Sequence, residues 1–145
     1  MHGISTDRDR IDRALVHEFL STQSYWARSR TREENDRIIA ASLCFGAYED
    51  DGAQVGHARV VTDTVSFGYL GDVFVVAGAR GRGIGKALLA AVLEHPAVRD
   101  LRRLALVTDD ATRSLRGLRL RAARRRPQVD AAPRRLTAGH LHSAR

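Results

Sequence analysis

Apolar residues in the first part of the chain recur at the spacing of an amphipathic helix. Five of them share one face of such a helix: Ile11, Leu15, Val16, Phe19 and Leu20. A second helix is predicted from Thr31 through Ile39. Thr31 and Glu34 stand at the spacing of a capping box, in which each side chain accepts a bond from the other residue's backbone N–H. Two helices joined by a loop are therefore expected.

Alternating apolar and polar residues follow and predict a hairpin. Residues 43–49 and 55–62 have strand periodicity, and the Asp-Asp-Gly sequence at 50–52 is a turn signal. A longer third strand is expected at 65–76, because residues 70–76 have the near-continuous apolar character of a buried strand.

The pattern then returns to helical spacing. Residues 84–95 place apolar side chains on one face, and Pro96 ends the predicted helix. That face consists of Ile84, Leu88, Ala91 and Val92. A strand is expected at 104–107, and residues 3–6 are the candidate for a short leading strand. The predicted order is helix, helix, three strands, helix, strand.

The length of 145 residues and the apolar fraction of 43% fit one small domain with one core. No apolar run reaches membrane-spanning length and no secretory signal is evident, so we expect a cytoplasmic protein. The single cysteine, Cys44, lies in an apolar run and is interpreted as a small buried residue. The number and spacing of the histidines indicate no metal site.

Charge is divided unevenly along the chain. Residues 113–145 carry ten Arg and one Asp, a net charge of +9, whereas residues 1–112 carry 14 Lys and Arg against 16 Asp and Glu. The C-terminal stretch has no aromatic residue and no strand pattern, so it cannot supply further strands. The chain is therefore divided into a domain at 1–112 and an Arg/Ala-rich tail at 113–145.

A glycine-rich sequence, Arg-Gly-Arg-Gly-Ile-Gly, connects the long strand to the helix that follows it. Its glycines let the backbone turn tightly and approach a ligand, and the N–H groups that begin a helix can bind an anion. The alternative is an ordinary glycine-rich connection with solvated arginines. The residues expected to hold a phosphate are Arg80, Gly81, Arg82, Gly83, Ile84, Gly85 and Lys86.

Spacing excludes two common phosphate loops. A nucleoside triphosphate P-loop needs glycine six positions before the lysine and serine or threonine after it, where this chain has Arg80 and Ala87. A dinucleotide fingerprint starting at Gly81 or Gly83 would need a third glycine where Lys86 or Leu88 stands.

The remaining pattern, Arg-x-x-Gly-x-Gly between a strand and a helix, resembles the GNAT superfamily of N-acetyltransferases. The motif itself matches in register from residue 72 to residue 89. The wider resemblance of the chain to the family stops at about residue 113. It implies an α/β (α+β) fold with a mixed, mainly antiparallel central sheet and flanking helices. Because the tail has no strand pattern, the C-terminal strands of that fold are expected to be lacking.

The same resemblance implies acetyl-CoA as cosubstrate. Its pantetheine arm would lie between the long strand and the strand after the helix, bonded to backbone groups of Phe74 and Val75. The Val75 N–H is the expected oxyanion donor. Asp72 is the candidate general base, and the alternative is that it pairs with a nearby arginine or caps a turn.

Other candidate residues are less specific. Tyr25 and Trp26, in the loop between the first two helices, are candidate acceptor contacts, and the alternative is that they pack on the core. His57 is expected on the polar face of its strand. In the family a tyrosine after the last strand often protonates the leaving thiolate. This chain's tyrosines all lie earlier: Tyr25, Tyr48 and Tyr69.

The tail allows three interpretations: a nucleic-acid-binding arm, a solvated extension, or a segment read out of frame. The third is our hypothesis. Codons for residues 113–120 can be chosen so that the next frame reads Gly-Leu-Tyr-Glu-Gly-Phe-Gly-Phe. That sequence restores the Gly-Leu-Tyr and Gly-Phe that similar family members carry there.

The predicted function is transfer of an acetyl group from acetyl-CoA to a primary amine of a small molecule or peptide, impaired by loss of the C-terminal helix. The alternatives are a non-catalytic acyl-CoA-binding remnant and a basic-tailed nucleic-acid-binding protein. No membrane partner is expected, nucleic acid is disfavoured, and a homodimer stays open.

Overall fold

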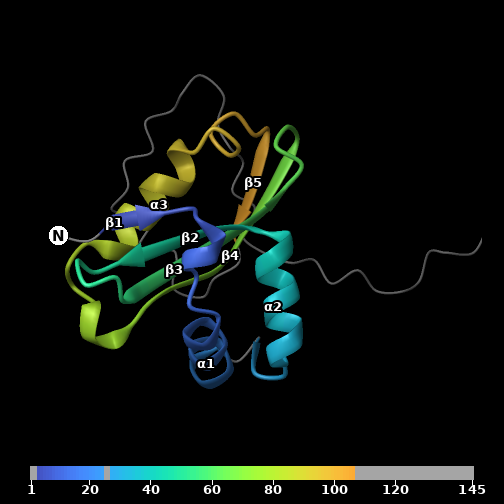
Figure 1. Ribbon diagram of the computed structural model, residues 1–145. Coiled ribbons are helices and arrows are strands. Elements are labelled where there is room, and N and C mark those ends of the chain that lie inside the picture. Colours follow the sequence, from blue (N-terminus) through green and yellow to red (C-terminus); the bar gives the residue numbers. More distant parts are fainter. Residues whose placement is uncertain (1–2, 25–26, 107–145) are drawn as a thin grey trace, which may run out of the picture.

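The computed structural model describes residues 3–24 and 27–106 (Figure 1). The described elements follow the predicted order, with boundaries a few residues away. They are β1 (Gly3–Ser5), the 3-10 helix η1 (Arg8–Arg10), α1 (Arg13–Gln23), α2 (Arg32–Ala41), β2 (Leu43–Tyr48), β3 (Gln54–Thr62), β4 (Phe67–Val75), the 3-10 helix η3 (Ala77–Ala79), α3 (Ile84–Glu94) and β5 (Arg103–Leu106).

Side-chain caps fix where the first two helices begin. The Asp12 carboxylate accepts from the Leu15 N–H at 3.0 Å, so α1 starts after Asp12, and Ile11 is buried just outside the helix. Thr31 and Glu34 form the predicted capping box at the start of α2, with bonds of 3.0 and 3.1 Å. Each cap satisfies N–H groups that the helix itself leaves without a partner.

The five described strands form one sheet in the order β1-β2-β3-β4-β5. The first four pair with one another antiparallel, and the predicted hairpin of β2 and β3 is confirmed. β5 lies parallel to β4, because α3 carries the chain back across the sheet between them. The predicted mixed, mainly antiparallel sheet with flanking helices is therefore confirmed for the described residues.

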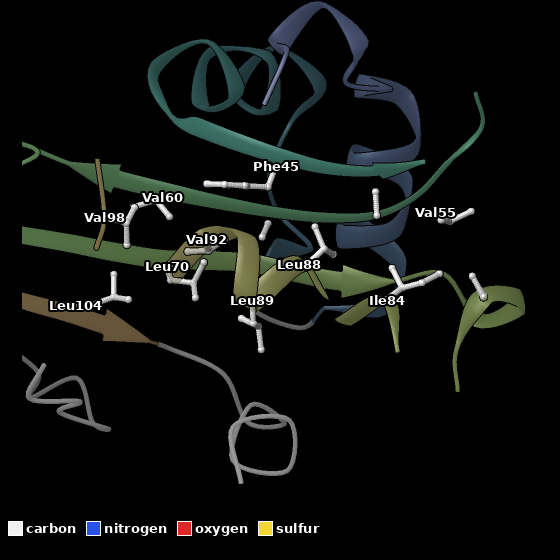
Figure 2. Close-up of a cluster of buried hydrophobic side chains, with 13 residues drawn as sticks. Phe45, Val55, Val60, Leu70, Ile84, Leu88, Leu89, Val92, Val98 and Leu104 are labelled. Carbon is white, nitrogen blue, oxygen red and sulfur yellow. The ribbon is translucent and has the colours of Figure 1, made fainter. Parts of the chain in front are cut away.

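Helices lie on both faces of the sheet (Figure 1), and each face has an apolar core. α3 covers one face, where Ile84, Leu88 and Val92 pack on side chains of β2, β3 and β4 (Figure 2). α1 and α2 cover the other face, where Val16, Leu20 and Ile39 surround Cys44 and Phe74. Strands β2 and β4 therefore contribute side chains to both cores, with Phe45 and Leu70 on the α3 side and Cys44 and Phe74 on the α1–α2 side. None of the helices in the described part of the chain has the length and apolar character needed to cross a membrane.

Candidate active site

β4 and β5 pair along only part of β4. The parallel register runs from Phe67 opposite Arg103 to Leu70 opposite Leu106, and β4 then continues to Val75. Over the described residues, the second half of β4 has a strand neighbour only on its β3 side. This is the gap in which the family resemblance implies that the pantetheine arm lies.

The register of β4 determines which backbone groups face that gap. The Val76 N–H donates to the Val55 carbonyl at 2.9 Å, so Val76 faces β3. Backbone groups alternate along an antiparallel strand, so those of Val75 face away from β3 and those of Phe74 face toward it. The predicted backbone contact at Val75 fits this geometry, and the one at Phe74 does not. The Phe74 ring instead stacks on Phe19 of α1, with centroids 4.0 Å apart.

The glycine-rich connection lies at the start of α3. Gly81 and Gly83 have φ angles of 77° and 78°, which side chains other than glycine rarely adopt, and Gly83 is the N-cap of the helix. An added Cβ would meet nothing within 4 Å at either position, so backbone conformation and not space favours glycine there. The Ala87 N–H makes the first helical bond, to the Gly83 carbonyl at 3.0 Å. The N–H groups before Ala87 therefore have no partner within the helix.

Two of the three predicted cations at this turn already have partners. Arg80 donates from Nε to the Val75 carbonyl at 3.2 Å, which links the turn to the end of β4. Arg82 forms a bidentate pair with Glu49, Nη1 to Oε1 and Nη2 to Oε2, the second bond being 3.0 Å long. Lys86 lies in the first turn of α3. The role of Glu49 is not predictable from local sequence, because a contact 33 residues away has no local signature.

Asp72 lies between two arginines in the structure. Arg30 donates from Nη1 to Oδ2 at 2.8 Å, and Arg59 donates from Nε to the same oxygen at 2.5 Å. Only 4% of the Asp72 side chain is exposed. Burial alone would raise the pKa of Asp72, but the hydrogen bond from Arg30 and the charge of Arg59 outweigh it and hold that pKa below its ordinary value. This is the arginine pairing that the sequence left as the alternative to a base.

His57 is wholly buried, which corrects its expected place on a polar face. Its ring lies 5.7 Å from that of Phe74, and neither ring nitrogen has a hydrogen-bond partner among the described residues. Burial lowers the pKa of His57 to about 4, so the ring is neutral at pH 7. Cys44 is buried as predicted, and burial raises the pKa of its thiol to about 11. That thiol is therefore no nucleophile at neutral pH.

A shallow surface groove of about 560 Å³ lies along α2, beside Arg30. It is lined by Ser29, Arg30, Glu34, Arg37, Ile38 and Ala41. Arg30 both lines the groove and bonds Asp72 of β4, so one residue connects the groove with that strand. Tyr25 and Trp26, the predicted acceptor contacts, lie outside the described residues.

Comparison with known proteins gives the same family for most of the chain. Residues 11–119 match the family model described as the acetyltransferase (GNAT) family. A protein of Gibberella zeae provisionally named an acetyltransferase is 30% identical over 129 residues, covering 74% of this chain and 71% of that protein.

Solved structures share the fold. A crystal structure from Xanthomonas campestris pv. campestris, provisionally assigned to the GNAT family, is 43% identical and has a TM-score of 0.76. The match covers 81% of this chain and 84% of that one. A provisionally assigned acetyltransferase of Deinococcus radiodurans, 22% identical with a TM-score of 0.61 over 79% of this chain and 78% of that one, shows likeness of fold alone.

Proposed function

Because the chain belongs to the GNAT acetyltransferase family, we propose that it transfers an acetyl group from acetyl-CoA to the primary amine of a small molecule or peptide. One observation carries the proposal. The glycine-rich turn and the start of α3 lie against Val75, at the far end of the part of β4 that has no β5 neighbour among the described residues. This turn, residues 80–86, is called the cradle below; it and an edge of β4 that is unpaired among the described residues thus lie close together.

The residues at the cradle fit a CoA pyrophosphate. The N–H groups of Ile84, Gly85 and Lys86 begin α3, where the helix dipole favours negative charge. Arg80 and Lys86 add positive charge within the same turn. When bound, acetyl-CoA supplies an acetyl thioester that a neutral amine can attack directly.

Val75 is the proposed oxyanion donor. Its N–H points away from β3, toward the gap, and needs no side chain to act. A fixed backbone donor stabilises the negative charge that develops on the thioester oxygen, because its orientation is set before the reaction.

Asp72 is a poor candidate for the general base. Its oxygens bond Arg30 and Arg59, and its lowered pKa makes it a weaker proton acceptor than an ordinary carboxylate. We therefore propose that water removes the proton of the amine.

The acceptor is proposed to bind in the groove beside Arg30. Tyr25 and Trp26 are proposed as acceptor contacts from their place in the sequence alone, between the first two helices. Arg30, Arg37 and Glu34 give that groove charges of both signs. A groove of this kind suits a polar amine better than a purely apolar one.

The test is release of free CoA thiol from acetyl-CoA when the chain is mixed with a panel of small amines and peptides. Thiol release that depends on both protein and amine supports the proposal. A second measurement is thermal stabilisation by CoA. Stabilisation that Gly83→Val abolishes, without turnover of any amine, would favour the non-catalytic CoA-binding alternative.

A further inference from the structure

Asp72 occupies a place in β4 where the backbone conformation is unusual. Between the pairs His57–Phe74 and Arg59–Gly71, β3 contributes one residue, Ala58, and β4 contributes two, Asp72 and Val73. β4 is therefore bulged at this point. Asp72 has a φ angle of 51°, in the left-handed region that residues other than glycine seldom occupy. Arg30 and Arg59 therefore bond the side chain of a residue whose backbone conformation is unfavourable.

The bulge decides what the end of β4 presents to its surroundings. Leu70 and Val73 both pack on the α3 side, although residues three apart in a regular strand lie on opposite faces. The extra residue also reverses the alternation of backbone groups after it. In an unbulged strand the N–H of Val75 would point into the ladder with β3, whereas here it points away.

The arginines that hold Asp72 come from different parts of the fold. Arg59 belongs to β3, the strand beside the bulge, and its side chain is 11% exposed. Arg30 belongs to the segment that leads into α2 and lines the groove, and its side chain is 14% exposed. A single buried carboxylate therefore connects the open edge of β4 with the groove beside α2.

We infer that Asp72 is a positioning residue: through Arg30 and Arg59 it fixes the β4 bulge that directs the Val75 N–H into the gap, and it holds the bulge against the segment that borders the groove. The catalytic consequence rests on the proposed function. The structural part can be measured without any turnover.

Three substitutions in the full chain test the charge of Asp72, the bond from Arg30, and an unrelated ion pair as the control. Asp72→Asn keeps the size of the side chain and its tolerance of the left-handed region but removes the charge. Arg30→Gln breaks the connection to the groove segment and leaves the Arg59 bond. Arg13→Gln is the matched control, because it breaks the Arg13–Asp36 pair between α1 and α2, 3.6 Å long, without touching β4.

The first readout is amide hydrogen exchange measured by mass spectrometry. Asp72→Asn is expected to speed exchange at residues 72–76 and 27–31, and Arg30→Gln at residues 27–31 above all. Arg13→Gln should change neither segment, and residues 43–48 of β2 serve as the internal reference. Unchanged exchange in both segments, or an equal rise in the reference strand, would overturn the inference.

The second readout is the split between kcat and KM on any amine that the unchanged chain acetylates. Asp72→Asn and Arg30→Gln are expected to lower kcat at least tenfold while changing the KM for acetyl-CoA less than threefold. Equal losses in both would indicate general damage and contradict the positioning role. If the unchanged chain acetylates no amine, the proposed function fails, and the exchange experiment still decides whether Asp72 fixes the bulge.

Discussion

His57 lies in an apolar environment that is unfavourable for a polar, titratable ring. It is wholly buried on the α1–α2 side of β3, and neither nitrogen has a hydrogen-bond partner among the described residues. A buried polar group without a partner costs roughly 1–3 kcal/mol. The nearby charges of Arg59 and Arg30 oppose protonation, and that of Asp72 favours it, but burial dominates. His57 should therefore make the fold sensitive to acid.

The sign of this pH dependence follows from the lowered pKa. The unfolded chain takes up a proton on this histidine near pH 6.5, whereas the folded chain does so only near pH 4. The free energy of unfolding should therefore fall as pH drops from about 6.5 to 4, by roughly 3 kcal/mol from this group alone. His57→Phe should remove that slope and leave stability at pH 7 equal or higher. Urea unfolding at pH 7, 6 and 5 measures both, and an identical slope in the variant would contradict the prediction.

The Glu49–Arg82 pair is a second interaction with a measurable consequence. Both terminal nitrogens of Arg82 bond Glu49, so this exposed and weak pair competes with any pyrophosphate for the same donors. Glu49→Gln is therefore expected to raise the affinity for CoA by up to roughly fivefold, less at high salt. Titration calorimetry measures this. Asp36→Asn, which makes the same charge change away from the cradle, is the control, and an equal gain there would show that only net charge matters.

At the level of single residues, local sequence could predict the cradle but not its partners. Gly81 and Gly83 follow from local spacing, because only glycine readily takes their backbone angles. Arg30, Arg59 and Glu49 act through contacts 13 to 42 residues away along the chain. Such contacts become visible only when the strands are in register.

At the start of α3, two glycines two residues apart have different backbone conformations. Gly83, at the N-cap, has a left-handed φ of 78°, whereas Gly85 lies inside the helix, where an added Cβ would meet only Val75 at 3.7 Å. Gly83→Ala should destabilise the chain by about 1–2 kcal/mol and reduce thermal stabilisation by CoA. Gly85→Ala should stabilise the ligand-free chain by up to about 1 kcal/mol, since alanine favours helix. Thermal unfolding with and without CoA checks both, and equal effects of the two variants would contradict the geometry.

β4 shows where element prediction reaches its limit. Its apolar pattern predicted a strand at 65–76, and the structure has one at Phe67–Val75. The bulge at Asp72 and Val73 was not predicted, because one extra residue on one strand is defined only by the strand opposite it. That bulge determines the direction of the Val75 N–H. The position of the strand was therefore easier to predict than the feature that gives it a proposed chemical role.

At the scale of the whole molecule, the described residues form two cores on one sheet, and β5 is its last described strand. The family match extends to residue 119, into the region where the basic tail begins. The order of elements was predictable because each has its own periodicity. The tail has no such periodicity. The out-of-frame hypothesis must therefore be tested by sequencing its codons and by comparing this chain with one in which the next reading frame is restored.

The out-of-frame hypothesis predicts that a chain with the next reading frame restored after residue 112 is the better enzyme. That frame would supply a tyrosine as acid for the leaving thiolate, a contribution of roughly 100-fold or more, and the strand-forming residues that the tail lacks. The expected result is at least a hundredfold higher turnover of acetyl-CoA with the same amine, and a higher unfolding temperature. CoA binding at the cradle should change less, because residues 80–86 are common to both chains. Equal turnover by the two chains, or codons at 113–120 that do not encode Gly-Leu-Tyr-Glu-Gly-Phe-Gly-Phe one base later, would overturn the hypothesis.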